Sequence, residues 1–312
     1  MLNKKLVHIV TYADCSYLMN VAALIKSIEY YSQERNKYKV FVLHSCDNEQ
    51  ILNRLDKTIK TVENNIDLVV KRIDFDLTQK LKSKKSYIND AIYNKLKLYS
   101  SLPDGIRKVL FIDADVIVKR DPADLYNIDL EGKVLAAVQD YYSKFSQEAK
   151  DAIGLKDNSD YFNSGIMVVD LKKWKEHKIE EKAIEFAVKK GHLTKLHDQD
   201  AFNHAVNGRW LKVSPLWNPR PNNIFVDERS NRVTMSKDQV YAKDLAYFVH
   251  YSGQNKPWLF TSAHSRKKDY LYFLRKTGFE DYKFPDKNIF GYFKRLNNKY
   301  KQLRKNFIKK SN

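Results

Sequence analysis

The chain has 312 residues, 43% of them hydrophobic and 30% charged, and its formal net charge is +18. This length suffices for one large domain or two smaller ones, and the composition excludes an intrinsically disordered chain. No window approaches the roughly 18 uninterrupted apolar residues of a membrane span, and there is no apolar region typical of a signal peptide. We therefore expect a soluble or peripheral, cytoplasmic protein whose charge suits an anionic partner.

Strand and helix patterns alternate in the first half of the chain. Short apolar runs predict strands at Leu6 to Tyr12, Val40 to Leu43, Leu68 to Ile73 and Val109 to Ile112. Apolar residues at helical spacing predict helices at Asn20 to Tyr31, Glu49 to Glu63 and Ala91 to Ser100. This alternation indicates βαβ units, and so an α/β fold with a Rossmann-like, mostly parallel sheet flanked by helices.

The pattern becomes less regular after Asp115. Further strands are predicted at Val116 to Val118, Val134 to Val138, Ser164 to Val169, Trp210 to Val213 and Leu245 to Val249. Helices are predicted at Lys172 to Lys190 and Gln199 to Val206. Because no internal repeat or low-complexity linker interrupts the sequence, we expect residues 1–285 to form one continuous domain.

Only two cysteines occur, Cys15 and Cys46, and each lies just past a predicted strand. Two thiols do not make a disulfide framework, so the sequence favours a reducing compartment. No second cysteine or histidine stands at ligand spacing beside either one, which argues against a zinc site.

Residues 286–312 differ from the rest of the chain. From Pro285 to Asn312 there are nine Lys or Arg residues and one acid. Large apolar residues recur there at spacings of four and three, at Ile289, Phe293, Leu296, Tyr300, Leu303 and Phe307. The spacing predicts a basic amphipathic helix with an aromatic stripe. Either the stripe packs on the domain and the lysines are solvated, or the helix lies on an anionic membrane, such as the inner face of the plasma membrane. We favour the membrane, because the helix is terminal and its polar face is almost wholly cationic.

Two carboxylates follow the predicted strand that ends at Ile112. Asp113 and Asp115 are two residues apart in an extended segment, so their side chains point to one face. Paired carboxylates at the carboxyl end of a strand can hold a hard divalent cation, which neutralises a diphosphate. Apolar residues flank the pair on both sides, so burying it without a cation would be costly. We interpret this pair as a metal site.

Two aspartates separated by one residue are weak evidence alone, and the pattern occurs three times. We interpret Asp74 and Asp76 as solvated acids at a strand end. In the third pair, Asp198 and Asp200, we expect Asp200 to be structural, as a cap of the helix that follows.

His250 ends a predicted strand, where an isolated histidine is more often a hydrogen-bonded core residue. Its neighbours favour a metal ligand instead, because Gly253 permits close approach of the backbone and Lys256 supplies a charge that can bind phosphate. One imidazole and two carboxylates suit manganese somewhat better than magnesium.

Four motifs occur in order between Leu6 and Phe260. They are Phe111-Ile-Asp-Ala-Asp-Val116, Tyr161-Phe-Asn-Ser-Gly165 with Val169-Asp-Leu-Lys-Lys-Trp174, His197-Asp-Gln-Asp200, and His250 to Trp258. In this combination the chain resembles glycosyltransferase family 8, in particular its retaining lipopolysaccharide galactosyl- and glucosyltransferases. The resemblance implies a GT-A catalytic domain that moves galactose or glucose from a UDP-sugar to a saccharide or glycolipid hydroxyl in bacterial surface-glycan synthesis.

The resemblance also assigns roles by position. It implies that Asp113, Asp115 and His250 hold manganese, with magnesium as the alternative. The nucleotide and diphosphate contacts would be Tyr12, Asp14, Lys95, Ala114, Gly253 and Lys256, and the donor-sugar ligands Asp140 and Asn163. Asp198 and Gln199 would flank the anomeric carbon as catalytic residues. Taken without the resemblance, Asp14 is equally well a helix-cap or turn aspartate, Asn163 is a turn residue before Gly165, and Lys95 is a solvated helix lysine.

Retention of anomeric configuration requires either a covalent intermediate or attack by the acceptor hydroxyl on the face that the leaving group occupies. Gln199 is the residue positioned for the first route, but an amide is a poor nucleophile. We therefore favour front-face attack, with Asp198 stabilising positive charge on the sugar and a UDP phosphate oxygen taking the acceptor proton.

Two other functions fit the sequence less well. A sugar-phosphate nucleotidyltransferase often has a glycine-rich first loop with a basic residue, and the segment Tyr12 to Tyr17 contains no glycine. A non-enzymatic nucleic-acid-binding protein would spread basic and aromatic residues over one face of the domain, whereas +8 of the +18 charge lies in residues 285–312. We therefore expect no nucleic-acid partner.

Overall fold

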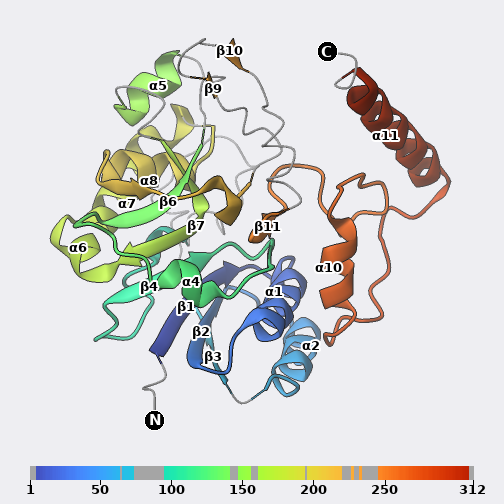
Figure 1. Ribbon diagram of the computed structural model, residues 1–312, viewed down its shortest axis with the longest axis horizontal. Coiled ribbons are helices and arrows are strands. Elements are labelled where there is room, and N and C mark those ends of the chain that lie inside the picture. The colour runs from blue at the N-terminus through green and yellow to red at the C-terminus, as the bar shows by residue number, and fades with distance from the viewer. Residues whose placement is uncertain are drawn as a thin grey trace.

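A seven-stranded sheet, in the order β3-β2-β1-β4-β7-β6-β8, forms the centre of the domain (Figure 1). The computed structural model describes residues 5–63, 65–73, 95–140, 147–155, 161–193, 195–219, 226–227, 232–233 and 245–308. The sheet strands are β1 (Lys5–Ala13), β2 (Asn36–His44), β3 (Ile66–Arg72), β4 (Lys108–Ile112), β6 (Leu135–Gln139), β7 (Phe162–Asp170) and β8 (Trp210–Lys212). Only β7 runs antiparallel to its two neighbours, so the predicted mostly parallel α/β sheet is confirmed.

Helices cover both faces of this sheet (Figure 1). Helices α1 (Leu18–Tyr31), α2 (Glu49–Ile59) and α10 (Lys267–Leu274) belong to one apolar layer, and α6 (Leu171–Glu176), α7 (Ile179–Lys190) and α8 (Asp198–Val206) to the other. Successive side chains of a strand pack into the two layers in turn. In β4, Leu110 and Ile112 pack in the first layer, and Val109 and Phe111 pack in the second. Burial on both faces explains why these strands are continuous apolar runs in the sequence.

Several elements differ from the sequence prediction. The expected helix from Lys172 to Lys190 is divided into α6 and α7, because Lys178 takes a left-handed conformation with φ 53°. Of the expected helix from Ala91 to Ser100, residues 91–94 lie outside the described residues, and Lys95–Lys97 forms a 3-10 turn, η1. Asp74 and Asp76 also lie outside the described residues. Elements that the apolar spacing did not reveal are α4 (Pro122–Tyr126), α5 (Gln147–Ile153), α10, η3 (Gly191–Leu193), η4 (Pro215–Trp217), β9 (Val226–Asp227) and β10 (Arg232–Val233).

A separate two-stranded antiparallel sheet joins two distant parts of the chain. It consists of β5 (Val116–Val118) and β11 (Phe248–His250), and its register places His250 opposite Val116. This pairing brings the end of β11 beside the residues that follow β4.

The two cysteines form a disulfide, with their Cα atoms 4.5 Å apart. β1 and β2 are parallel neighbours in which Ala13 is level with His44, so the loops that follow them meet. The expectation of a reducing compartment, which rested on the two thiols forming no disulfide framework, therefore loses its basis. Two cysteines separated by 31 positions give no sign in the sequence that their strands pair in this register.

The C-terminal segment forms helix α11 (Ile289–Ile308), which projects from the domain beyond α10 (Figure 1). Among the described residues, no helix combines the length and the apolar character needed to cross a membrane.

Candidate active site

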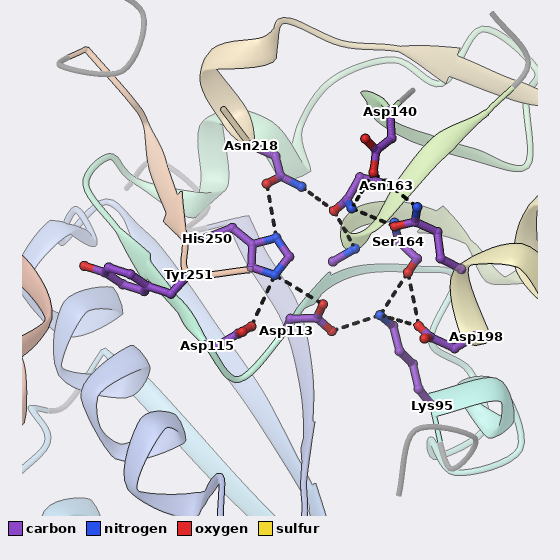
Figure 2. Close-up of polar contacts among 12 residues, drawn as sticks. Lys95, Asp113, Asp115, Asp140, Asn163, Ser164, Asp198, Asn218, His250 and Tyr251 are labelled. Atoms are coloured by element: carbon purple, nitrogen blue, oxygen red, sulfur yellow. Dashed lines mark hydrogen bonds and ion pairs between the residues drawn. The ribbon is translucent and has the colours of Figure 1, made fainter. Parts of the chain in front are cut away.

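The two carboxylates and the imidazole that the sequence selected lie together where β4, β5 and β11 meet (Figure 2). The backbone N–H of Asp113 donates to Gly165 O at 2.7 Å, which holds the start of the segment against β7. The N–H of Tyr251 donates to Asp115 O at 2.9 Å and extends the β5–β11 pairing by one residue. The backbone thus fixes both sides of the cluster.

The side chains of Asp113, Asp115 and His250 converge on one point. His250 Nε2 lies 3.2 Å from Asp115 Oδ1 and 3.7 Å from Asp113 Oδ2, and one ligand atom from each residue lies within 4.8 Å of the others. Two carboxylates and one imidazole, mostly buried, form a donor set that suits a divalent cation such as Mn²⁺. The residues therefore fit the metal that the resemblance implies.

Gly165 on β7 makes this convergence possible. A Cβ atom at this position would overlap the His250 ring and would lie 2.7 Å from Asp113 Oδ2. Because only glycine leaves this space open, the imidazole and the carboxylate can approach the strand together.

Two lysines flank the cluster, one on each side. Lys95 Nζ lies 2.9 Å from Asp113 Oδ1 and 3.0 Å from Asp198 Oδ2. Lys256 Nζ lies 2.5 Å from Asp115 Oδ2. Each carboxylate of the pair thus shares its charge with an ammonium group, and Lys95 also connects the pair to Asp198. The interpretation of Lys95 as a solvated lysine is wrong, since its side chain is only 8% exposed.

These contacts shift the protonation equilibria of the buried groups. Burial would raise the pKa of Asp115, but His250 and Lys256 outweigh it and hold this pKa well below its usual range. For Asp113 burial prevails and raises the pKa, although Lys95 and His250 oppose it. Burial would lower the pKa of both lysines, but their carboxylate partners raise it instead. Asp115 is therefore a carboxylate and both lysines are cations at neutral pH.

A cavity of about 380 Å³ opens beside the cluster. It is lined by Tyr12, Ala13, Asp14, Tyr17, Lys95, Phe111, Asp113, Ala114, Asp115 and Asp198. The fold thus brings the residues predicted at the end of β1 to the same space as the carboxylate pair. Asp14 is also a turn residue, since its Oδ1 accepts from the Tyr17 N–H at 3.1 Å. The cavity combines apolar and aromatic walls with a few charged groups, as is typical of ligand sites.

Other predicted residues lie behind this cavity and are bonded to one another. Asn163 Nδ2 donates to Asp140 Oδ2 at 3.2 Å and to Gln199 Oε1 at 2.7 Å. Gln199 Nε2 donates in turn to Asp140 Oδ2 and to the Tyr161 hydroxyl. The side-chain amides of Asn163 and Gln199 are therefore engaged within the protein. Of the two expected catalytic residues, only Asp198 lines the cavity.

The remaining predicted residues have simpler surroundings. Gly253 takes a φ of +81°, so the loop after β11 needs its conformational freedom. Asp200 is structural as expected, but it accepts from the Tyr161 hydroxyl and from the N–H groups of Lys195 and Leu196, before the helix, instead of capping α8.

Sequence reasoning missed two polar residues that contact this cluster. Ser164 donates to Asp198 Oδ2 at 3.1 Å and accepts from Lys95 Nζ at 3.2 Å. Asn218 lies beside His250, with Oδ1 3.2 Å from Nδ1 of the ring. Ser164 stands inside the Tyr161-Phe-Asn-Ser-Gly165 motif, whereas Asn218 lies within the Pro/Asn-rich sequence 215–223, which has no periodicity. Only the burial of Asn218 distinguishes it.

A comparison with protein families assigns the chain to a known group, because the model of "Glycosyl transferase family 8" matches residues 8–262. The chain belongs to this family. The match covers the β1 loop, the carboxylate pair, the β7 motif and His250, so the resemblance inferred from the four motifs is confirmed.

Curated relatives and solved structures agree with this assignment. The chain is 25% identical to "General stress protein A" of Bacillus subtilis over 276 residues, covering 88% of this chain and 94% of that protein. It is 27% identical to "Lipopolysaccharide 1,2-glucosyltransferase" of Escherichia coli over 271 residues, covering 86% and 77%. The galactosyltransferase LgtC, solved with donor and acceptor sugar analogs, superposes with a TM-score of 0.70 at 23% identity, covering 87% and 96%. This structural likeness supports the GT-A-like fold.

Proposed function

We propose that this family member is a retaining, metal-dependent hexosyltransferase that moves galactose or glucose from a UDP-sugar to a saccharide or glycolipid hydroxyl. The observation that carries the proposal is the convergence of Asp113, Asp115 and His250 at the edge of a cavity that also contains Lys95 and Asp198. A site of this kind can receive a nucleoside diphosphate at the metal and a sugar beside Asp198. Relatives named as a glucosyltransferase and a galactosyltransferase support a hexose donor.

The proposed roles follow from the positions of the charges. Asp113, Asp115 and His250 would hold Mn²⁺ or Mg²⁺, which when bound acts as a Lewis acid for the departing diphosphate. Lys256 would contact the diphosphate from the Asp115 side, and Lys95 would bridge the carboxylate pair and Asp198. Aromatic and polar residues at the end of β1 and just after it would hold the nucleoside: Tyr12, Asp14 and Tyr17. Asp140, buried at the far end of the amide network, would receive the sugar hydroxyls through rearrangement of that network.

The transfer is proposed to proceed by front-face attack. The acceptor hydroxyl oxygen forms the new bond to the anomeric carbon, the bond from that carbon to the UDP oxygen breaks, and the hydroxyl proton passes to a phosphate oxygen of the departing UDP. Asp198 is the carboxylate that would stabilise positive charge on the sugar ring. Gln199 fits a nucleophilic role less well, because its amide oxygen already accepts two hydrogen bonds.

A donor screen tests the proposal directly. The purified chain is incubated with UDP-galactose, UDP-glucose and other UDP-sugars, and release of UDP is measured with Mn²⁺, with Mg²⁺ and with EDTA. We expect release from one of the two hexose donors, loss of activity in EDTA and restoration by Mn²⁺. Hydrolysis that is unaffected by chelation, or absence of release from every UDP-sugar, would contradict the proposal.

We also propose that helix α11 attaches the enzyme to an anionic lipid surface. The helix is held to the domain by one face: the Tyr292 ring lies 4.7 Å from that of Phe260, Arg295 lies over the same ring, and Asn298 donates to Thr261 O. Because these contacts occupy the docking face, the stripe is turned away from the domain. Its members Ile289, Phe293, Leu296 and Tyr300 are 65–68% exposed.

The positive charge of the segment indicates which kind of surface would cover this stripe. The segment after Pro285 carries nine cations and one acid, and the exposed apolar residues lie among those cations. A lipid surface with anionic headgroups offers both an apolar layer and negative charge, whereas a protein partner would need a matching acidic groove. Membrane attachment would bring the enzyme to a lipid surface, where a glycolipid acceptor is accessible. Leu303 and Phe307, which complete the predicted stripe, have side chains outside the described residues.

Deletion of Asn288 to Asn312 tests the attachment. We expect the shortened protein to lose sedimentation with vesicles of phosphatidylglycerol, while its release of UDP from a soluble donor remains within about twofold of wild type. Equal sedimentation of both proteins would exclude α11 as the attachment. Equal binding of the full chain to neutral phosphatidylcholine would show that anionic headgroups are not what it recognises.

A further inference from the structure

A chain of hydrogen bonds leads from His250 into the interior of the domain (Figure 2). His250 Nδ1 lies 3.2 Å from Asn218 Oδ1, and Asn218 Nδ2 donates to Asn163 Oδ1 at 2.6 Å. Asn163 Nδ2 continues the chain to Gln199 Oε1 at 2.7 Å. Asn218 is fully buried, and the other three residues are at most 7% exposed, so water cannot readily replace these partners.

The direction of this chain is set by two backbone N–H groups. A side-chain amide can be turned end for end, which exchanges its donor and its acceptor, but a backbone N–H can only donate. The N–H of Gly165 donates to Asn163 Oδ1 at 3.0 Å, and that of Ser164 donates to Gln199 Oε1 at 3.2 Å. The oxygen of Asn163 must therefore accept the hydrogen bond, and the NH₂ group of Asn218 must donate it.

The orientation of Asn218 then decides the state of the imidazole. With its nitrogen turned to Asn163, Asn218 presents an oxygen to His250, and an oxygen can only accept, so Nδ1 of the ring carries a hydrogen. In a neutral imidazole the other nitrogen, Nε2, then carries a lone pair, and Nε2 is the atom that faces Asp113 and Asp115.

We propose that Asn218 is a positioning residue that fixes both the orientation and the tautomer of His250, so that Nε2 is available as a metal ligand. The inference rests on the proposed metal site. A histidine that binds a metal through one nitrogen commonly donates its other N–H to a fixed acceptor, and losing that acceptor weakens metal binding by about 10- to 100-fold.

The first test reads the tautomer without any metal. In metal-free protein labelled with ¹⁵N-histidine, at a pH at which the ring is neutral, the ring shifts of His250, identified with His250→Gln, should show the Nδ1–H tautomer. Asn218→Leu keeps the branched shape of the side chain but removes its acceptor. We therefore expect the Nε2–H tautomer, whose N–H can donate to Asp115, to become dominant. An unchanged Nδ1–H tautomer in this variant would overturn the proposal.

The second test reads Mn²⁺ affinity by calorimetry. We expect Asn218→Leu to raise the dissociation constant by about 10- to 100-fold, and Asn218→Gln, which retains both an acceptor for Nδ1–H and a donor for Asn163 Oδ1, to lose less affinity. Wild-type affinity in Asn218→Leu would contradict the proposal.

The matched control is Asn36→Leu. Asn36 is also a buried, hydrogen-bonded asparagine, but its partners are Tyr38 and Asp121, away from the carboxylate site. It should leave the tautomer and the Mn²⁺ affinity unchanged. If Asn218→Leu does not fold, Asn218→Ala is measured in the same two ways. If wild-type protein binds no Mn²⁺, the proposed metal site fails, while the tautomer of the metal-free protein still decides the role of Asn218.

Discussion

The carboxylate site and helix α11 both place side chains in energetically unfavourable environments, but of opposite kinds. At the site, charges are withdrawn from water, and Lys95 and Lys256 compensate Asp113 and Asp115. On α11, a stripe of large apolar side chains is left two-thirds exposed to water. The charges at the site are therefore compensated mainly within the chain, whereas the apolar stripe of the helix stays exposed. This difference motivates the two proposals: a small cation and ligand at the site, and an extended lipid surface for the helix.

The largest effect is expected from removing one charge of the carboxylate pair. Asp113→Asn or Asp115→Asn should lower release of UDP by at least about 100-fold, because the leaving group loses its charge stabilisation. Asp67→Asn is the matched control, since Asp67 is a 63% exposed acid paired with Lys39. Circular dichroism checks that each variant folds. Turnover at the wild-type rate in either site variant would contradict the metal assignment.

Gly165→Ala tests whether the site depends on the close approach of β7. The added Cβ would displace His250 or Asp113, so we expect Mn²⁺ affinity to fall by about 10- to 100-fold. The overpacking should cost about 1–3 kcal/mol of unfolding free energy. Calorimetry with Mn²⁺ and chemical denaturation measure the two effects separately. Wild-type Mn²⁺ affinity in this variant would mean that the ring need not approach β7.

The exposed stripe can be separated from the charge of α11. Each fully buried Leu or Phe contributes about 1.5–3 kcal/mol. Phe293→Ser combined with Leu296→Ser should therefore weaken binding to anionic vesicles at least about 10-fold without changing the charge. Tyr272→Ser is the control, because Tyr272 is a 46% exposed aromatic residue on α10. If the double variant binds as tightly as the wild type and 0.5 M salt abolishes this binding, the interaction depends on charge alone and the apolar stripe does not contribute.

The smallest effect reports on the docking of α11 itself. Burial, and next the charge of Arg295, lower the pKa of Lys267 to about 8, although Asp286 opposes them. Arg295→Gln should therefore raise this pKa by only part of the difference from the ordinary value, because burial remains. A ¹³C NMR titration of the lysine side chains measures it, with Lys267→Arg identifying the signal. No change on removal of Arg295 would mean that α11 does not dock as described.

The lowered pKa of Lys267 also predicts the direction in which the unfolding free energy changes with pH. Lys267 has a lower pKa in the folded chain than the roughly 10.4 of an unfolded lysine. Between about pH 8 and 10.4 the unfolded state therefore binds more protons, and the contribution of Lys267 to the unfolding free energy rises with pH. Denaturation of the wild type and of Lys267→Met across this range should differ in slope in that direction.

Sequence patterns that depend on near neighbours were sufficient for much of the molecule. The alternation of apolar runs with helical periodicity determined the layered α/β fold, because strands and helices that bury one side must repeat their apolar residues at fixed intervals. The spacing of Asp113 and Asp115 likewise determined that both carboxylates share a face. The composition of the segment after Pro285 determined that a helix there would be basic and amphipathic.

Tertiary structure decided what depends on strands and loops meeting at a distance. Cys15 meets Cys46 only because β1 and β2 pair in register, and His250 reaches the carboxylates only because β11 pairs with β5. Asn218 has no neighbour in the sequence that reveals its role; two backbone N–H groups on another strand set its direction. The apolar spacing predicted the stripe of α11, but contacts with Phe260 and Thr261 determine the direction in which it faces. A periodicity specifies the faces of an element, whereas only packing specifies what each face meets.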